Sequence, residues 1–160
     1  MARRTTGFLT CNAMEPNTLI ELQALTNAAN GKKREGNLTA TIPYLGKIVH
    51  LLDTQTSKQR SAQDKSMTQT LELMGAEARI DFANALFQTQ QYAECEVQTG
   101  LVCKFFERYL KKPDLNQSER IGIQSKLLVQ YDAWADCYEN LGNSFLADKI
   151  RKRKEKVLPK

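Results

Sequence analysis

The stretch Ala76–Leu110, AEARIDFANALFQTQQYAECEVQTGLVCKFFERYL, predicts two helices joined by a short turn. Apolar residues recur in it at the spacing of one helix face, in two runs separated by the polar break Gln88–Gln91. The first stripe contains Ala78, Phe82, Ala85 and Leu86, and the second contains Tyr92, Cys95, Thr99, Val102, Phe106 and Leu110. Neither helix could bury its stripe alone, so we expect the pair to form an antiparallel hairpin.

The composition of the whole chain favours an all-α fold. At 160 residues, 41% of them hydrophobic and 26% charged, the chain can form one globular domain with a substantial core. Glycine and proline, which interrupt helices, are rare, and no segment sustains the alternation of a half-buried strand. The sequence therefore predicts helices throughout.

Neither a membrane span nor a metal site is expected. No apolar run approaches the roughly 20 residues that cross a bilayer, and Gly7-Phe8-Leu9 is too short for a signal peptide. The four cysteines lack CxxC spacing, and His50 is the single histidine, so we expect buried thiols and no cofactor. We therefore expect a cytoplasmic protein, with the nucleus as the alternative.

Breaks and caps along the chain predict three hairpins. Residues 1–16 lack periodicity and are expected to form a flexible N-terminal arm. Residues 17–159 are expected to form one domain, with hairpins at about 17–58, 66–112 and 116–158. The polar segment Asp53–Lys65 either extends the second helix or forms a loop.

Individual residues support these boundaries. Asn17 or Thr18 can cap the first helix, and Asn116 with Glu119 has the spacing of a capping box. Pro43 stands early enough in the second helix to be tolerated near its first turn.

Three turns recur at a nearly constant interval. Second helices begin after Gly36-Asn37, Gln90-Gln91 and Gly142-Asn143, at separations of 54 and 52 residues. A repeated helix–turn–helix unit predicts a stacked solenoid.

The three segments resemble tetratricopeptide repeats, over roughly residues 22–159. The resemblance lies in small residues where paired helices approach, in the turns, and in Pro159 after the last helix. The small residues are Ala29, Ala83 and Ala135 on the first helices, and Cys95 and Ala147 on the second. Such side chains let helix axes approach closely. The resemblance implies an all-α superhelix of three antiparallel hairpins with about six helices.

The chain also departs from the family pattern. Its spacing exceeds the usual 34 residues, Thr41 replaces a small apolar residue, and Gln90 replaces the turn glycine. Long-helix variants, such as those in proteasome-lid subunits, are the nearest comparison. A plain helical bundle is the alternative.

Catalytic motifs are missing from the sequence. It contains no phosphate-binding loop, HExxH or GxSxG, and a single histidine limits general-base schemes. Asp132, Asp136 and Glu139 form an acidic ridge that could hold a metal or a basic peptide, although such ridges are usually solvated. We therefore do not expect an enzyme.

The resemblance implies a groove, lined by the first helix of each hairpin, that binds a peptide or a partner helix. Phe87 is its candidate anchor, unless the ring packs on a neighbouring hairpin. The implied lining is Asn30, Lys33, Arg34, Glu77, Ile80, Asn84, Phe87, Gln88, Asp132, Asp136, Glu139 and Asn140. This lining is basic in the first unit and acidic in the third, which would suit a dipolar partner.

The C-terminal tail, residues 149–160, carries the net positive charge of the chain. Its basic residues include Lys149, Arg151, Lys152, Arg153, Lys154 and Lys156, against the single acid Glu155. The tail either forms a solvated helix face, acts as a nuclear-import or nucleic-acid contact, or meets an anionic membrane or protein.

We therefore expect a non-catalytic adaptor or complex subunit that binds a partner protein. The competing function is a nucleic-acid or ribonucleoprotein accessory protein that uses the basic C-terminal helix. An obligate oligomer is a third alternative.

Overall fold

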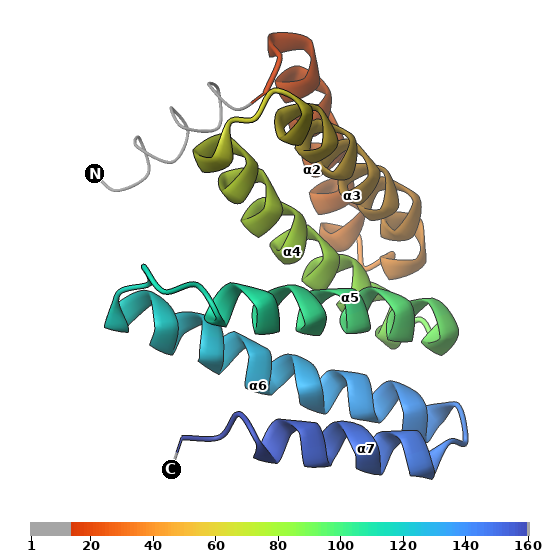
Figure 1. The fold of residues 1–160 in the computed structure, drawn as a ribbon. Coiled ribbons are helices and arrows are strands. Elements are labelled where there is room, and N and C mark those ends of the chain that lie inside the picture. Colours follow the sequence, from red (N-terminus) through yellow and green to blue (C-terminus); the bar gives the residue numbers. More distant parts are fainter. Residues whose placement is uncertain (1–13, 160) are drawn as a thin grey trace. The chain divides into compact units, whose positions relative to one another are not determined.

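The computed structural model describes residues 14–159, which form six α-helices and no strand (Figure 1). The helices are α2 (Pro16–Arg34), α3 (Leu38–Ser61), α4 (Lys65–Gln88), α5 (Tyr92–Leu110), α6 (Gln117–Asn140) and α7 (Ser144–Glu155). The predicted all-α class and the six helices are confirmed within these residues. None of these six helices combines the length and the hydrophobicity that spanning a bilayer requires.

The chain divides into two compact units, Met1–Ala85 and Leu86–Lys160. The boundary falls near the end of α4, so the first unit holds α2, α3 and most of α4, and the second holds α5, α6 and α7. The single domain over residues 17–159 stays a prediction. Most of the expected N-terminal arm, residues 1–13, lies outside the described residues.

In the first unit, α2 packs against α3 as the first predicted hairpin requires. Met14, Ile48, Leu52 and Leu71 are buried together, with aliphatic residues of α2, α3 and α4 packed around them. The helix α3 continues to Ser61, so the segment after Asp53 extends the helix rather than forming a loop. Gln55 and Thr56 in this extension are buried, so it packs into the unit. The polar sequence of the segment does not suggest such burial.

The start of α2 differs from the prediction. Pro16 occupies the first turn, and no side chain caps the helix. Thr18 is instead buried, where its Oγ1 accepts a hydrogen bond from Gln55 Nε2 at 3.3 Å. Because the Thr18 hydroxyl bonds the buried Gln55 amide, it does not cap the helix. Pro16 has no backbone N–H, so the first turn has one donor fewer that needs a cap.

Three turns share one backbone geometry. Gly36, Gln90 and Gly142 all lie in the left-handed region, with φ of 75°, 63° and 76°. In each turn the next amide donates to the carbonyl five residues earlier, as in a Schellman motif. These bonds join Asn37 to Lys32 (3.0 Å), Gln91 to Leu86 (2.8 Å) and Asn143 to Tyr138 (2.8 Å). The turns that the sequence aligned are therefore equivalent in structure, and Gln90 adopts the conformation of the glycines it replaces.

Asparagines begin several of the following helices. The Oδ1 atoms of Asn37 and Asn143 each accept a backbone N–H at 3.1 Å. Asn116 and Glu119 form the predicted capping box, with Glu119 N donating to Asn116 Oδ1 at 2.8 Å. These bonds satisfy amides that the first helical turn leaves without partners.

In the second unit, α6 packs against both α5 and α7. Ala135 and Ala147 are buried, as the small-residue pattern predicted, and so is Cys95. Gly100 on α5 lies tightly against α6, because an added Cβ would lie 3.0 Å from the Trp134 ring. Arg120 on α6 donates to the carbonyl of Leu110 at 2.7 Å, satisfying the C-terminal end of α5.

Candidate binding groove

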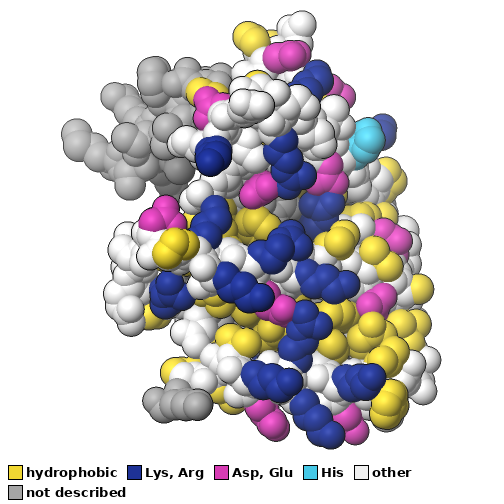
Figure 2. Space-filling view, in the orientation of Figure 1, with side chains coloured by type: hydrophobic (Ala, Val, Ile, Leu, Met, Phe, Trp, Pro, Cys, Tyr) yellow, Lys and Arg dark blue, Asp and Glu magenta, His cyan; other side chains and the backbone are white. Residues whose placement is uncertain are grey.

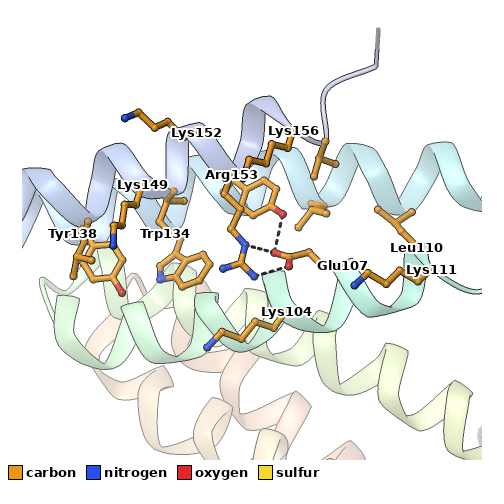
Figure 3. Close-up of a pocket in the computed structure, with 15 residues that line it drawn as sticks. Lys104, Glu107, Leu110, Lys111, Trp134, Tyr138, Lys149, Lys152, Arg153 and Lys156 are labelled. Carbon is orange, nitrogen blue, oxygen red and sulfur yellow. Dashed lines mark hydrogen bonds and ion pairs between the residues drawn. The ribbon is translucent and has the colours of Figure 1, made fainter.

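The second unit contains an open groove of about 900 Å³ formed by α5, α6 and α7 (Figure 3). We call it the basic groove. The side chains that line it are Lys104, Glu107, Leu110, Lys111, Leu127, Tyr131, Trp134, Tyr138, Leu146, Lys149, Ile150, Lys152, Arg153, Lys156 and Val157.

Cationic side chains line the basic groove from two helices. Lys104 and Lys111 come from α5 and its C-cap, and Lys149, Lys152, Arg153 and Lys156 come from α7. Helical spacing explains the second set, since residues separated by three, four or seven positions share a face. Figure 2 shows Lys and Arg side chains gathered, with apolar surface between them, over α5 to α7.

Glu107 on α5 is the single acid in this lining, and it connects all three helices. Its carboxylate accepts hydrogen bonds from Arg153 Nε at 2.8 Å and Nη2 at 2.6 Å, and from Tyr131 Oη at 2.8 Å (Figure 3). The hydrogen bonds to Glu107 raise the pKa of Arg153, and burial followed by the same carboxylate raises the pKa of Tyr131. Glu107 therefore holds α6 and α7 against α5.

A second carboxylate fixes the aromatic floor. Glu96 Oε1 accepts hydrogen bonds from Trp134 Nε1 at 3.0 Å and from Tyr138 Oη at 2.6 Å. Burial, followed by this hydrogen bond, raises the pKa of Tyr138 to about 12. Lys104 Nζ and the Arg153 guanidinium lie 5.9 and 5.6 Å from the Trp134 ring centroid, within cation–π range. Because Trp134 is only 4% exposed, its ring face offers little room for stacking a base.

The predicted basic tail separates into two faces. Arg151 donates to Glu139 at 2.8 Å and to Asp148 at 3.0 Å, which raises its pKa. Lys154 Nζ lies 2.8 and 2.9 Å from the carboxylate oxygens of Asp132. These two cations therefore join α7 to the acidic ridge of α6, whereas the lysines of the other face line the basic groove.

The structure places the other predicted partner residues on both units. Asn30, Lys33, Arg34, Glu77, Ile80 and Asn84 belong to the first unit, and Phe87, Gln88, Asp132, Asp136, Glu139 and Asn140 to the second. All are exposed except Ile80 and Phe87, which are half-buried. The Phe87 ring makes an edge contact with Tyr92, with centroids 5.2 Å apart. That these predicted partner residues form one shared surface stays a prediction.

Sequence reasoning missed the residues that α5 supplies to the basic groove. Lys104 and Lys111 stand seven positions apart, and Glu107 lies between them. This spacing places the two lysines on one face of α5, but no sequence signal joins that face to α7. The tail alone therefore suggested a basic helix rather than a basic groove.

No family model matches the chain, and comparisons with curated proteins and with solved structures also find no match.

Proposed function

We propose that the protein is a non-catalytic binding protein, an adaptor or subunit of a larger assembly, and that the basic groove holds a segment of its partner. One observation carries this proposal: three helices enclose about 900 Å³ whose apolar floor is bordered by cations. An apolar surface flanked by charged side chains is the usual form of a groove that receives a partner helix. Location in the cytoplasm, with the nucleus as the alternative, belongs to the same proposal.

A tetratricopeptide-like repeat is the architecture that we propose for the chain. Its support is the recurrence of one turn geometry at Gly36, Gln90 and Gly142, together with buried Ala29, Ala83 and Ala135. Repeats of this kind commonly serve as scaffolds for noncovalent binding.

Nucleic-acid binding is the second candidate, because five of the groove-lining side chains are lysines. Phosphate groups would be the contact, and the affinity would fall steeply with salt.

Site-specific photocrosslinking in cells tests the proposal. A photoreactive residue would replace Lys104 in the basic groove or Asn84 on the exposed surface of α4, with exposed Lys47 on α3 as the control. We expect position 104 to capture a discrete protein that position 47 does not. Capture from position 84 alone would move the binding surface to α4. Capture of nucleic acid in place of protein at position 104 would replace the proposal with the second candidate.

A further inference from the structure

The lysines of the basic groove differ from the other cations of α7 in their partners. Arg151, Arg153 and Lys154 are each paired with a carboxylate. Within residues 14–159, no ion pair joins a carboxylate to the groove lysines, which are Lys104, Lys111, Lys149, Lys152 and Lys156. The acids of the second unit thus neutralise the rest of α7 and leave the groove strongly positive.

The five lysines form two rows. Lys104 and Lys111 are seven residues apart on α5, and Lys149 and Lys156 are seven apart on α7 with Lys152 between them. Seven helical residues span about 10 Å, which is two turns. A partner helix of at least two turns could therefore place carboxylates along both rows.

The surface between the two rows is mostly apolar, and the Glu107–Arg153 ion pair crosses it from α5 to α7. Leu110, Leu146 and Val157 are half-buried, so part of each side chain is open to solvent. Leu127 and Ile150 are buried beneath the groove. Apolar side chains gain free energy by covering such surface, whereas a phosphate backbone gains none. This floor favours a protein segment over a nucleic acid.

We infer that the occupant of the basic groove is an acidic amphipathic helix of a partner protein, with an apolar stripe flanked on both sides by aspartate or glutamate. The inference rests on the proposed binding function and names its partner by charge and periodicity. The chain's own N-terminal residues 1–13 do not have this chemistry, since they contain two arginines and no acid.

Synthetic helical peptides test the inference by fluorescence anisotropy with the full-length protein. The first probe carries a leucine stripe flanked by glutamates. The second has the same composition in a shuffled order without helical amphipathicity, and the third replaces glutamate with lysine. Duplex DNA and single-stranded RNA are titrated in parallel from low to physiological ionic strength.

The variant Lys152→Gln/Lys156→Gln removes two groove charges, and Lys47→Gln/Lys65→Gln removes two exposed charges in the first unit as the matched control. Exposed ion pairs contribute about 0.2 to 1 kcal/mol each, so the groove variant should weaken the first peptide about two- to thirty-fold. The control should bind as the wild type does. Unchanged circular dichroism in both variants shows that folding is intact.

We expect the ordered acidic peptide to bind more tightly than the shuffled one, and the lysine peptide not to bind. Equal binding of the ordered and shuffled peptides would overturn it, because affinity would then be charge alone. Nucleic acid that binds while the acidic peptide does not would also overturn it. If position 104 captures a protein while every acidic peptide fails, the binding function stands and the inferred chemistry is wrong.

Discussion

Replacing Glu107 with glutamine should destabilise the second unit and at the same time strengthen binding of an acidic ligand. Glu107 Oε1 accepts from Tyr131 and from Arg153 Nε, and Oε2 accepts from Arg153 Nη2. The glutamine oxygen can keep the first two bonds, but its NH2 group would face the third donor. The substitution therefore removes one charge-assisted hydrogen bond and the ion pair.

The loss of stability follows from the bonds that the substitution removes. Hydrogen bonds to charged groups contribute about 1.5 to 3 kcal/mol. The low end applies because the Arg153 side chain is 41% exposed, so we expect a loss of about 2 kcal/mol. A carboxylate about 8 Å from a ligand carboxylate in the solvent-exposed groove repels it by about 0.5 to 1 kcal/mol. Its removal should tighten acidic-peptide binding about two- to fivefold.

Glu96→Gln is the matched control. Both donors to Glu96 bond to Oε1, so glutamine keeps both bonds and loses only the charge, at a cost of about 1 kcal/mol. Glutamine keeps both bonds to the aromatic floor and Glu96 does not itself line the basic groove, so peptide affinity should change less than in Glu107→Gln. Urea unfolding followed by Trp134, the single tryptophan, reports the stability of the second unit directly. An unchanged stability of Glu107→Gln would show that Glu107 does not hold the three helices together, and a weaker affinity for the acidic peptide would show that its charge does not repel the ligand.

Three further outcomes are expected. Gly142→Ala should lower the free energy of unfolding in urea by about 1 to 2 kcal/mol, because the φ of Gly142 is 76°. Gly122→Ala inside α6 should raise it by up to about 1 kcal/mol, and the reverse order would contradict the turn geometry. Burial raises the pKa of Tyr131 above its ordinary value of 10.0, so the unfolded chain releases this proton at a lower pH than the folded chain does. The free energy of unfolding should therefore fall as the pH rises above 10, and it should fall less steeply in Tyr131→Phe. Parallel slopes in the two proteins would contradict this coupling. The three cysteines of the described residues are buried, so a thiol reagent should label at most Cys11 rapidly in the native protein. It should label all four thiols in denaturant, and two rapidly labelled thiols in the native protein would contradict the packing.

Features that depend on neighbouring residues in sequence could be predicted from it. The capping box at Asn116 is an example, since its side chain bonds the amide of Glu119, three residues on. The same holds for the recurring turn, although Gln90 shows that a non-glycine residue also adopts it.

Features that depend on how one helix packs on another could not be predicted. The tail reads as a uniform run of cations, yet Arg151 and Lys154 face carboxylates of α6 while Lys149 and Lys152 line a groove with α5. The division depends on the rotation of α7 about its axis against α6, which periodicity alone does not determine. Glu107 was missed for the same reason, because its partners lie 24 and 46 residues away.

The most direct test of the basic groove is an NMR titration of the full-length protein with the glutamate–leucine peptide. If the basic groove binds this peptide, shifts should concentrate on the Trp134 indole and on the amides of α5 and α7 that surround Lys104, Lys111, Lys149 and Lys156. The corresponding amides of the Lys152→Gln/Lys156→Gln variant should shift less at the same peptide concentration. Saturable shifts confined to other surfaces, such as the α4 surface at Asn84 or the α6 ridge at Asp136, would show that the basic groove is not the binding site.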